Sequence, residues 1–163
     1  MTRADFSPVT SKLVTRVLFV CMGNICRSPL GEAILRRQAA EREIPVTVDS
    51  AGTGDWHIDE SSDHRAIRVG ERRGYPMTHR ARQVCPMDFR EFDLIVVMDE
   101  ENLRTLQRIP GFAADKVRFA RSFDPDADSH EVEDPYYGSL EEFETIADQL
   151  EAACRGILTV IGG

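Results

Sequence analysis

Long apolar runs are missing from this chain of 163 residues, and no stretch approaches the ~20 consecutive apolar residues that a membrane-spanning helix needs. The first residues also lack the charged-then-apolar pattern of a secretory signal, so no membrane insertion is expected. Internal repeats and low-complexity tracts are absent too, which favours one globular domain. The polar residues 1–15 are predicted to be a flexible leader, and residues 16–163 to form that single domain.

Cysteine and basic charge are both in short supply. The chain has 4 Cys without the spacing of a disulfide framework, so a reducing compartment, the cytoplasm, is expected. Cys21 and Cys26 have no second ligand pair nearby, which excludes a structural zinc site. Lys and Arg number 20 against 28 Asp and Glu, giving a net charge of -8. Nucleic acid and anionic membranes need a basic face, so neither is expected as a partner.

The segment around Cys21 is the most informative part of the chain. A run of apolar, partly β-branched residues, 17–20, ends at Cys21, and Arg27 follows six residues later. The run predicts a buried strand with the thiol at its carboxyl end, where open α/β sheets bind their ligands. Ser28 is interpreted as a helix N-cap and Pro29 as the first helical residue. The loop between strand and helix then directs backbone N–H groups and a helix dipole at one small volume, as anion sites do.

This loop is predicted to bind phosphate beside a reactive thiol. Arg27 can grip two phosphate oxygens with its planar charged fork, and the positive surroundings favour the thiolate form of Cys21 at neutral pH. Taken singly, a buried thiol and a surface arginine would be ordinary. The agreement of strand, glycine, arginine and helix start favours the anion site instead, and its expected loop members are Met22, Gly23, Asn24, Ile25, Cys26 and Ser28.

Phosphoryl transfer from an alcohol also needs a proton donor for the leaving oxygen. The acidic stretch 124–138 offers six carboxylates, from Asp124, Asp126, Asp128, Glu131, Glu133 and Asp134. Asp134 stands out because Asp134-Pro135 begins a turn leading into Tyr136 and Tyr137, whose rings could wall an aromatic substrate. The residues alone favour Asp134 only modestly over Asp124. A calcium loop is excluded, because the stretch has no Gly at its sixth position and Pro135 stands where a bidentate Glu is needed.

Hydrophobic periodicity predicts alternating strands and helices. Strands are expected over residues 16–20, 46–51, 94–98 and 117–120, and helices over residues 29–41, 63–73, 100–108 and 140–161. Strands that alternate with helices across short connections indicate an α/β fold with a parallel sheet.

Two stretches, residues 17–36 and 133–138, closely resemble the low-molecular-weight protein tyrosine phosphatases, and residues 49–53, 78–83 and 97–103 are also similar to that family's pattern. The resemblance implies a four-stranded parallel sheet flanked by helices on both faces, a flavodoxin-like arrangement also called phosphotyrosine phosphatase I-like. It implies a single phosphatase domain over residues 16–163, with Cys21 as nucleophile, Arg27 as phosphate clamp and Asp134 as general acid. The choice between Asp134 and Asp124 is thereby resolved.

The same resemblance implies supporting and substrate-binding roles. The family's asparagine, matched by Asn24, is held by residues matched here by Ser28, Ser50 and His79. Trp56, Tyr136 and Tyr137 match positions at the pocket entrance, where a deep cleft with aromatic walls suits an aryl phosphate. The implied substrate is a phosphotyrosyl protein, hydrolysed through a cysteinyl-phosphate intermediate to inorganic phosphate by a monomer that uses no cofactor or metal.

Three other activities fit parts of this pattern. Arsenate reductases of this fold need two further cysteines close together, whereas Cys85 has no neighbour and Cys154 lies in the last predicted helix. Protein arginine phosphatases resemble the chain but carry threonine where it has Ile25 and lack the paired tyrosines. A catalytically idle phosphoprotein-binding module would not need an intact set of nucleophile, clamp and acid.

Cys26 has two interpretations. It lies five residues after Cys21, so a reversible disulfide between them could protect the nucleophile from over-oxidation. Alternatively, Cys26 only packs beneath the loop.

Overall fold

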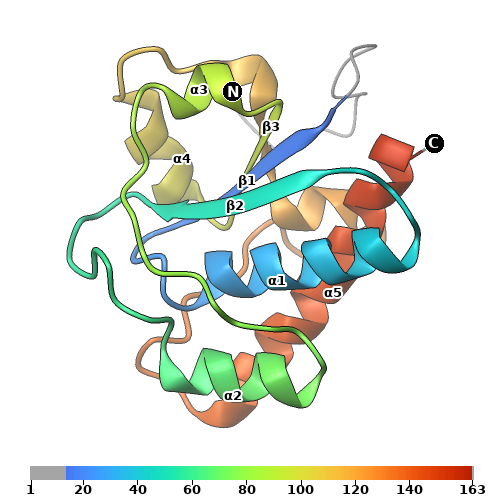
Figure 1. Ribbon diagram of the computed structural model, residues 1–163. Coiled ribbons are helices and arrows are strands. Elements are labelled where there is room, and N and C mark those ends of the chain that lie inside the picture. The colour runs from blue at the N-terminus through green and yellow to red at the C-terminus, as the bar shows by residue number, and fades with distance from the viewer. Residues whose placement is uncertain (1–13, 163) are drawn as a thin grey trace.

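Four parallel strands form the centre of the computed structural model, which describes residues 14–162 (Figure 1). The strands lie in the order β2-β1-β3-β4, so β1 lies inside the sheet, between β2 and β3. This is the doubly wound order expected of a flavodoxin-like fold, and the predicted fold class is confirmed. The strands are β1 (Arg16–Cys21), β2 (Thr47–Gly52), β3 (Leu94–Val97) and β4 (Val117–Phe119).

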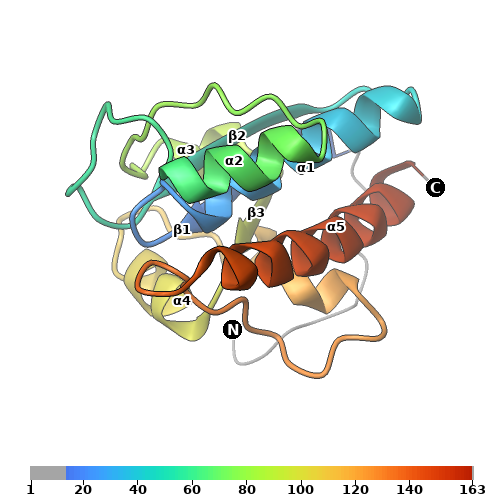
Figure 2. The ribbon, with the colours of Figure 1, turned by 90° about the horizontal axis from the view of Figure 1, so that it is seen from below.

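Helices cover both faces of this sheet, as Figure 2 shows from below. They are α1 (Arg27–Glu41), α2 (His64–Arg72), α3 (Asp88–Glu91), α4 (Glu100–Gln107) and α5 (Leu140–Gly162). Alternate residues of β1 serve the two faces: Val17 and Phe19 pack with α1, α2 and α5, while Leu18 and Val20 pack with α3 and α4. Both sets are fully buried, because a parallel sheet with two covered faces has no solvated side.

Helix α1 lies unusually close to β1. A Cβ atom on Gly31 would come within 2.7 Å of the Phe19 ring, so only glycine allows this approach. The helix begins at Arg27, with Cys26 as its N-cap, and the prediction of Ser28 as N-cap is wrong. Ser28 lies in the first helical turn because its hydroxyl is engaged by Cys21 and Asn24 rather than by the helix backbone.

The other predicted elements are confirmed with small shifts at their ends. Asp63 caps α2 by accepting a hydrogen bond from the amide of Arg65, and Gly74, at φ +88, follows its last turn. Three short helices of the described chain were not predicted: α3 and the 3-10 helices Ala114–Lys116 and Ala120–Phe123. Three or four residues are too short to show helical periodicity.

The start of the described chain is attached to the sheet. Residues 1–13 of the predicted leader lie outside the described residues. Val14 is buried, and Thr15 donates to Asp93 Oδ2 through its amide at 2.9 Å and its hydroxyl at 3.1 Å. Across residues 14–162, no helix combines the length and apolar character needed to cross a membrane.

Candidate active site

Cys21 is the last residue of β1 and lies at the carboxyl edge of the sheet. Its side chain is almost fully buried, and its Sγ lies 3.0 Å from Ser28 Oγ. The amide of Ser28 donates to the same sulfur at 3.4 Å. A hydroxyl and an amide from the first turn of α1 therefore surround the sulfur, and both can stabilise negative charge on it.

The loop between β1 and α1 has free donors. In the described chain, the amides of Gly23, Asn24, Ile25 and Cys26 donate no hydrogen bond. Asn24 holds the left-handed backbone conformation, with φ +58, which bends the loop around a common centre. Gly52, at the end of β2, permits this shape, because a Cβ there would approach the Met22 carbonyl oxygen to 2.9 Å.

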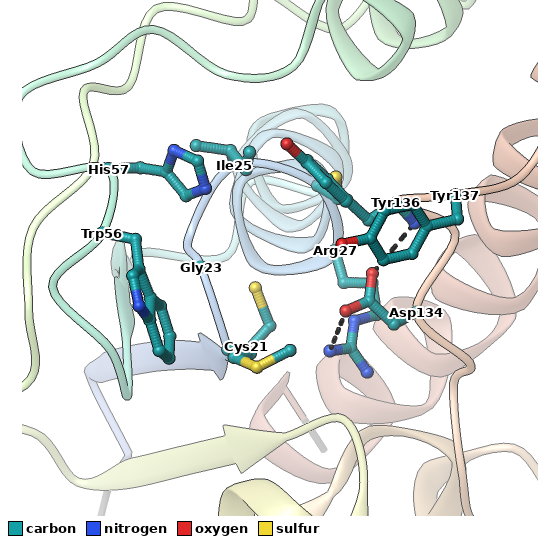
Figure 3. A pocket seen from close by; sticks show the side chains of 11 residues that line it. Cys21, Gly23, Ile25, Arg27, Trp56, His57, Asp134, Tyr136 and Tyr137 are labelled. Atoms are coloured by element: carbon teal, nitrogen blue, oxygen red, sulfur yellow. Dashed lines mark hydrogen bonds and ion pairs between the residues drawn. The ribbon is translucent and has the colours of Figure 1, made fainter.

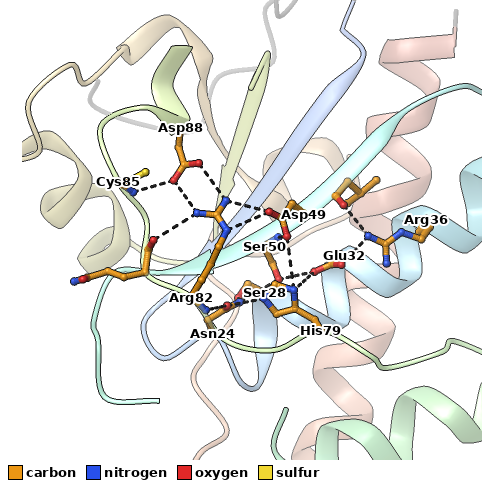
Figure 4. A network of polar contacts seen from close by, with 12 residues as sticks. Asn24, Ser28, Glu32, Arg36, Asp49, Ser50, His79, Arg82, Cys85 and Asp88 are labelled. Atoms are coloured by element: carbon orange, nitrogen blue, oxygen red, sulfur yellow. Dashed lines mark hydrogen bonds and ion pairs between the residues drawn. The ribbon is translucent and has the colours of Figure 1, made fainter. Parts of the chain in front are cut away.

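Asn24 is the hub of the hydrogen bonds that hold this loop (Figure 4). Its side-chain amide donates to Ser28 Oγ at 2.8 Å and to Ser50 Oγ at 3.0 Å. Its Oδ1 accepts from the amide of Arg82 at 2.9 Å and contacts His79 Nε2 at 2.8 Å. The structure thus brings together the four residues that the resemblance connects, and it adds Arg82.

A second layer of charge supports this hub. His79 Nδ1 lies 3.1 Å from Oε1 of Glu32, a buried carboxylate, while its Nε2 contacts the Asn24 oxygen. The His79 ring therefore links the Asn24 side chain to the buried carboxylate of Glu32. Glu32 also accepts from Ser50 Oγ at 2.6 Å and from Arg36 Nη2 at 2.7 Å.

Glu32 and His79 also belong to a group that could hold a metal ion. Together with Asp49 they place three potential ligand atoms within 4.8 Å of one another. Ser50 already donates to Glu32 Oε1 through its hydroxyl at 2.6 Å and to Asp49 Oδ1 through its amide at 2.8 Å, and His79 Nδ1 lies 3.1 Å from Glu32 Oε1. We therefore interpret the group as support for the loop.

Arg27 is the largest fully buried side chain of the described structure. Its Nη1 donates to Asp99 Oδ2 at 2.7 Å and to the Val132 carbonyl at 2.8 Å. Burial acts to lower its pKa, but the charges of Cys21, Asp99 and Asp134 outweigh burial, so the pKa of Arg27 lies above its ordinary value. Its Nε is buried without a partner among the described residues, which leaves a donor for an anion.

Asp134 lies beside Arg27 and lines the same pocket. Its Oδ2 is 3.6 Å from Arg27 Nη2, and its Oδ1 accepts from the amide of Tyr136 at 3.0 Å (Figure 3). The second contact is an Asx turn, which orients the carboxylate. Asp124, the rejected alternative, instead accepts from Asp126 in its own exposed turn and is not among the pocket-lining residues.

The pocket has a volume of about 380 Å³. Figure 3 shows Trp56 on one side of it and Tyr136 with Tyr137 on the other. Trp56 is 65% exposed and Tyr137 97% exposed, so both rings are free to stack on a bound group. Residues from distant parts of the chain line it together: Cys21, Met22, Gly23, Ile25, Cys26, Arg27, Trp56, His57, Asp134, Tyr136 and Tyr137.

A family model described as low molecular weight phosphotyrosine protein phosphatase matches residues 16–162. The chain belongs to this family. The low molecular weight protein-tyrosine phosphatase A of Mycobacterium tuberculosis is 43% identical over 145 residues, which cover 86% of this chain and 88% of that protein.

Two solved structures show the same likeness. A protein tyrosine phosphatase from Entamoeba histolytica, with Hepes in its active site, superimposes with a TM-score of 0.85 at 36% identity, covering 89% of this chain and 95% of that one. A Drosophila arginine phosphatase superimposes with a TM-score of 0.82 at 30% identity, covering 88% and 95%. The family's fold therefore extends over the described chain.

Cys26 is the last residue of the phosphate loop and lines the pocket together with Cys21. Cys21 and Cys26 are both free thiols in the structure. Burial, together with the charges of Cys21, Asp63 and Asp134, raises the pKa of Cys26 far above its ordinary value. The Cys26 thiol therefore stays protonated at neutral pH, which makes it a slow nucleophile.

Sequence reasoning missed four residues of the site: Arg82, whose amide donates to Asn24, and Asp99, Glu32 and His57. Asp99 lies in the stretch 97–103 that carried the resemblance, but no local pattern connects it with Arg27, 72 residues away. Glu32 reads as an ordinary charge on a helix until the fold buries it. His57 lines the pocket with its Nδ1 held by Glu60 at 2.9 Å, and a Cβ on Gly23 would lie 3.2 Å from its ring.

Proposed function

We propose that this member of the tyrosine phosphatase family hydrolyses phosphotyrosyl proteins through a cysteinyl-phosphate intermediate, using only its own side chains and water. One observation carries the proposal: the Cys21 sulfur, the buried Arg27 guanidinium and the Asp134 carboxylate line a single pocket with aromatic walls. These are a nucleophile, an anion clamp and a proton donor, which together suffice for phosphoryl transfer from an aryl ester.

The substrate phosphate would bind in the loop between β1 and α1. The free amides of residues 23–26 and the unpartnered Nε of Arg27 can donate to its equatorial oxygens. Because Asp99 and the Val132 carbonyl hold Nη1 of Arg27, the guanidinium is oriented before substrate arrives. Donors that are already in position stabilise charge in the transition state without reorganising.

In the first step, the Cys21 thiolate attacks phosphorus opposite the leaving oxygen. The sulfur–phosphorus bond forms as the phosphorus–oxygen bond breaks, and protonated Asp134 gives its proton to the departing tyrosyl oxygen. The products are the dephosphorylated tyrosyl protein, a cysteinyl phosphate and an ionised Asp134. Arg27, 3.6 Å from that carboxylate, stabilises the charge that Asp134 acquires.

In the second step, water replaces the leaving group. Asp134 accepts a proton from the water as the oxygen attacks phosphorus, and the sulfur–phosphorus bond breaks. Inorganic phosphate leaves, and the sulfur returns as a thiolate beside Ser28 Oγ, 3.0 Å away. A donated hydrogen bond from that hydroxyl makes the sulfur a better leaving group.

Aryl phosphates are the preferred class in this proposal. Cys21 is 2% exposed at the base of the pocket, whereas Trp56 and Tyr137 at its rim are widely exposed. A long aryl ester can reach the sulfur while its ring lies between aromatic side chains, which a short seryl ester cannot do. The Drosophila neighbour makes phosphoarginine a second candidate. Ile25 in the loop and the paired tyrosines favour phosphotyrosine.

The test compares phosphate release from three peptides of matched sequence that carry phosphotyrosine, phosphoarginine or phosphoserine, with chelator present and Cys21→Ser as control. We expect chelator-resistant release that favours phosphotyrosine and disappears in the variant. Preference for phosphoarginine would replace the proposed substrate class. No release from any peptide would refute the proposal in favour of a binding module or a reductase. A reductase would have to use Cys154, which is buried in α5, or the exposed Cys85.

We also propose that residues 16–163 form a single phosphatase domain that acts as a monomer in the cytoplasm. The acidic composition and the few irregularly spaced cysteines support the location, and the matched range 16–162 supports the single domain. Light scattering at two protein concentrations tests the oligomeric state.

A further inference from the structure

We infer that Asp63 and Arg65, at the start of α2, are positioning residues that hold Asp134 in register with the Cys21 loop. The inference rests on the proposed function, because it assigns these two residues a role in proton transfer by Asp134. We call the pair the α2 bracket. No local sequence pattern connects the pair with Asp134, which lies about seventy residues further along the chain.

One end of the bracket is attached to the phosphate loop. The amide of Asp63 donates to the Ile25 carbonyl at 2.8 Å. The Asp63 side chain, 8% exposed, caps α2 by accepting from the amide of Arg65 at 2.8 Å. A shift of α2 relative to the loop would therefore break a backbone hydrogen bond made by the loop itself.

The other end is attached to the segment that carries Asp134. Arg65 Nη1 donates to the Gly138 carbonyl at 2.7 Å, and Nη2 donates to the Tyr136 carbonyl at 2.8 Å. The amide of Tyr136 in turn donates to Asp134 Oδ1 at 3.0 Å. Figures 1 and 2 show the segment before α5 passing beside the N-terminal end of α2.

Within the described chain, Arg27 and Arg65 are the only side chains from outside residues 134–138 that make polar contacts with this segment. Arg27 holds the carboxylate, whereas Arg65 holds the backbone that presents it. Without Arg65, Arg27 would be the one side chain outside the segment, among the described residues, that still makes a polar contact with it.

Arg65 is itself held in one orientation. Its Nε and Nη2 donate to the two oxygens of Asp63 at 3.0 and 2.8 Å, and its guanidinium lies 4.6 Å from the Phe143 ring centroid. Hydrogen bonding to Asp63 raises the pKa of Arg65. Burial acts to raise the pKa of Asp63, but the hydrogen bonds from Arg65 outweigh burial, so the pKa of Asp63 lies below its ordinary value. A lysine could not make the bidentate pair and reach two carbonyls at once.

A role through Asp134 has a kinetic signature. General acid catalysis matters most when the leaving group is a poor one, so displacement of the acid costs more rate for phenyl phosphate than for 4-nitrophenyl phosphate. A purely structural defect would lower both rates by the same factor. The comparison uses kcat/KM, which reports on the step in which the leaving group departs.

The experiment compares Arg65→Met and Arg65→Lys with the matched control Arg73→Met. Arg73 also lies at an end of α2, its side chain has the same 22% exposure, and it pairs with Glu144 and Asp148 of α5 rather than with the Asp134 segment. Each variant is assayed with both aryl phosphates, and its stability is measured by urea unfolding. Asp134→Ala, alone and combined with Arg65→Met, completes a double-mutant cycle.

We expect Arg65→Met to lower kcat/KM by about 30-fold or more for phenyl phosphate and by only about 3-fold for 4-nitrophenyl phosphate. The larger loss is expected because small misplacements of a catalytic group can cost ~100-fold in rate. Arg65→Lys should lie nearer to the methionine variant than to the parent. In the Asp134→Ala background, the Arg65→Met change should have little further effect on phenyl phosphate.

The inference would be overturned if Arg65→Met lowered kcat/KM by the same factor for the two substrates. It would also be overturned if Arg65→Met lowered kcat/KM for phenyl phosphate as much in the Asp134→Ala background as in the parent. An Arg73→Met variant with the same leaving-group dependence as Arg65→Met would overturn it as well. A parent enzyme that releases no phosphate from either ester would instead overturn the proposed function, so the two failures are distinguishable.

Discussion

Replacing Asn24 tests the hydrogen-bonded hub of the phosphate loop. Its side chain is 1% exposed and makes four hydrogen bonds, to Ser28, Ser50, Arg82 and His79. At about 1 kcal/mol net for each buried hydrogen bond, Asn24→Gly should lower the free energy of unfolding by about 4 kcal/mol. Asn24→Ala loses the same bonds and must also hold φ +58, so it should be less stable by about 1 kcal/mol more.

The two variants separate side-chain from backbone effects. Urea unfolding followed by far-UV circular dichroism gives the free energies, and phosphotyrosine peptide hydrolysis gives kcat/KM. We expect both variants to lose at least about 100-fold in kcat/KM, because the loop no longer holds its donors in place. A glycine variant within about 1 kcal/mol of the parent would refute the claim that these bonds hold the loop. An alanine variant as stable as the glycine variant would refute the added cost of holding φ +58 at residue 24.

Three further predictions follow from individual side chains. Asp134→Ala should reduce kcat/KM by ~100-fold or more for phenyl phosphate and much less for 4-nitrophenyl phosphate; an equal loss would contradict its role as acid. Burial raises the pKa of Cys26 and Cys154 above their ordinary value of 9.0. As pH rises above about 9, the unfolded chain therefore releases these two protons while the folded chain keeps them, and the folded state loses stability. Unfolding free energies measured from pH 8 to 10 should fall with a slope that is shallower in Cys154→Ala, and an unchanged slope would count against the prediction. Cys26→Ser should recover less activity than the parent after peroxide and reductant, with the difference growing as pH rises; equal recovery would show that Cys26 only packs beneath the loop.

Local pattern predicts the parts of this site that are close in sequence. The apolar run before Cys21, the glycine, the arginine and the start of α1 are all within thirteen residues, so one segment specifies the loop. The predicted start of α1 was still wrong. The Ser28 hydroxyl was expected to cap the helix, but it contacts the Cys21 sulfur, which is a tertiary contact. N-cap propensity considers only the helix backbone.

Contacts between distant segments could not be predicted from residue type. Asp99 holds Arg27 across 72 residues, and Arg65 holds Gly138 across 73. In the sequence, Asp99 and Arg65 each resemble an ordinary surface charge. Their partners become apparent only when the fold brings β1, β3 and the start of α2 to one edge of the sheet. The turn at Asp134-Pro135 favoured Asp134 only modestly, and resemblance to a family separated it from the five neighbouring carboxylates.

The most direct test of the account is to trap the phosphorylated enzyme. The parent enzyme is mixed with a phosphotyrosine peptide, quenched in acid within milliseconds, and analysed by peptide mass spectrometry. The account predicts one phosphoryl group on Cys21, formed as free tyrosine peptide appears and lost as inorganic phosphate is released. Phosphate release with no modified Cys21 at any time, or turnover that persists in Cys21→Ser, would contradict it.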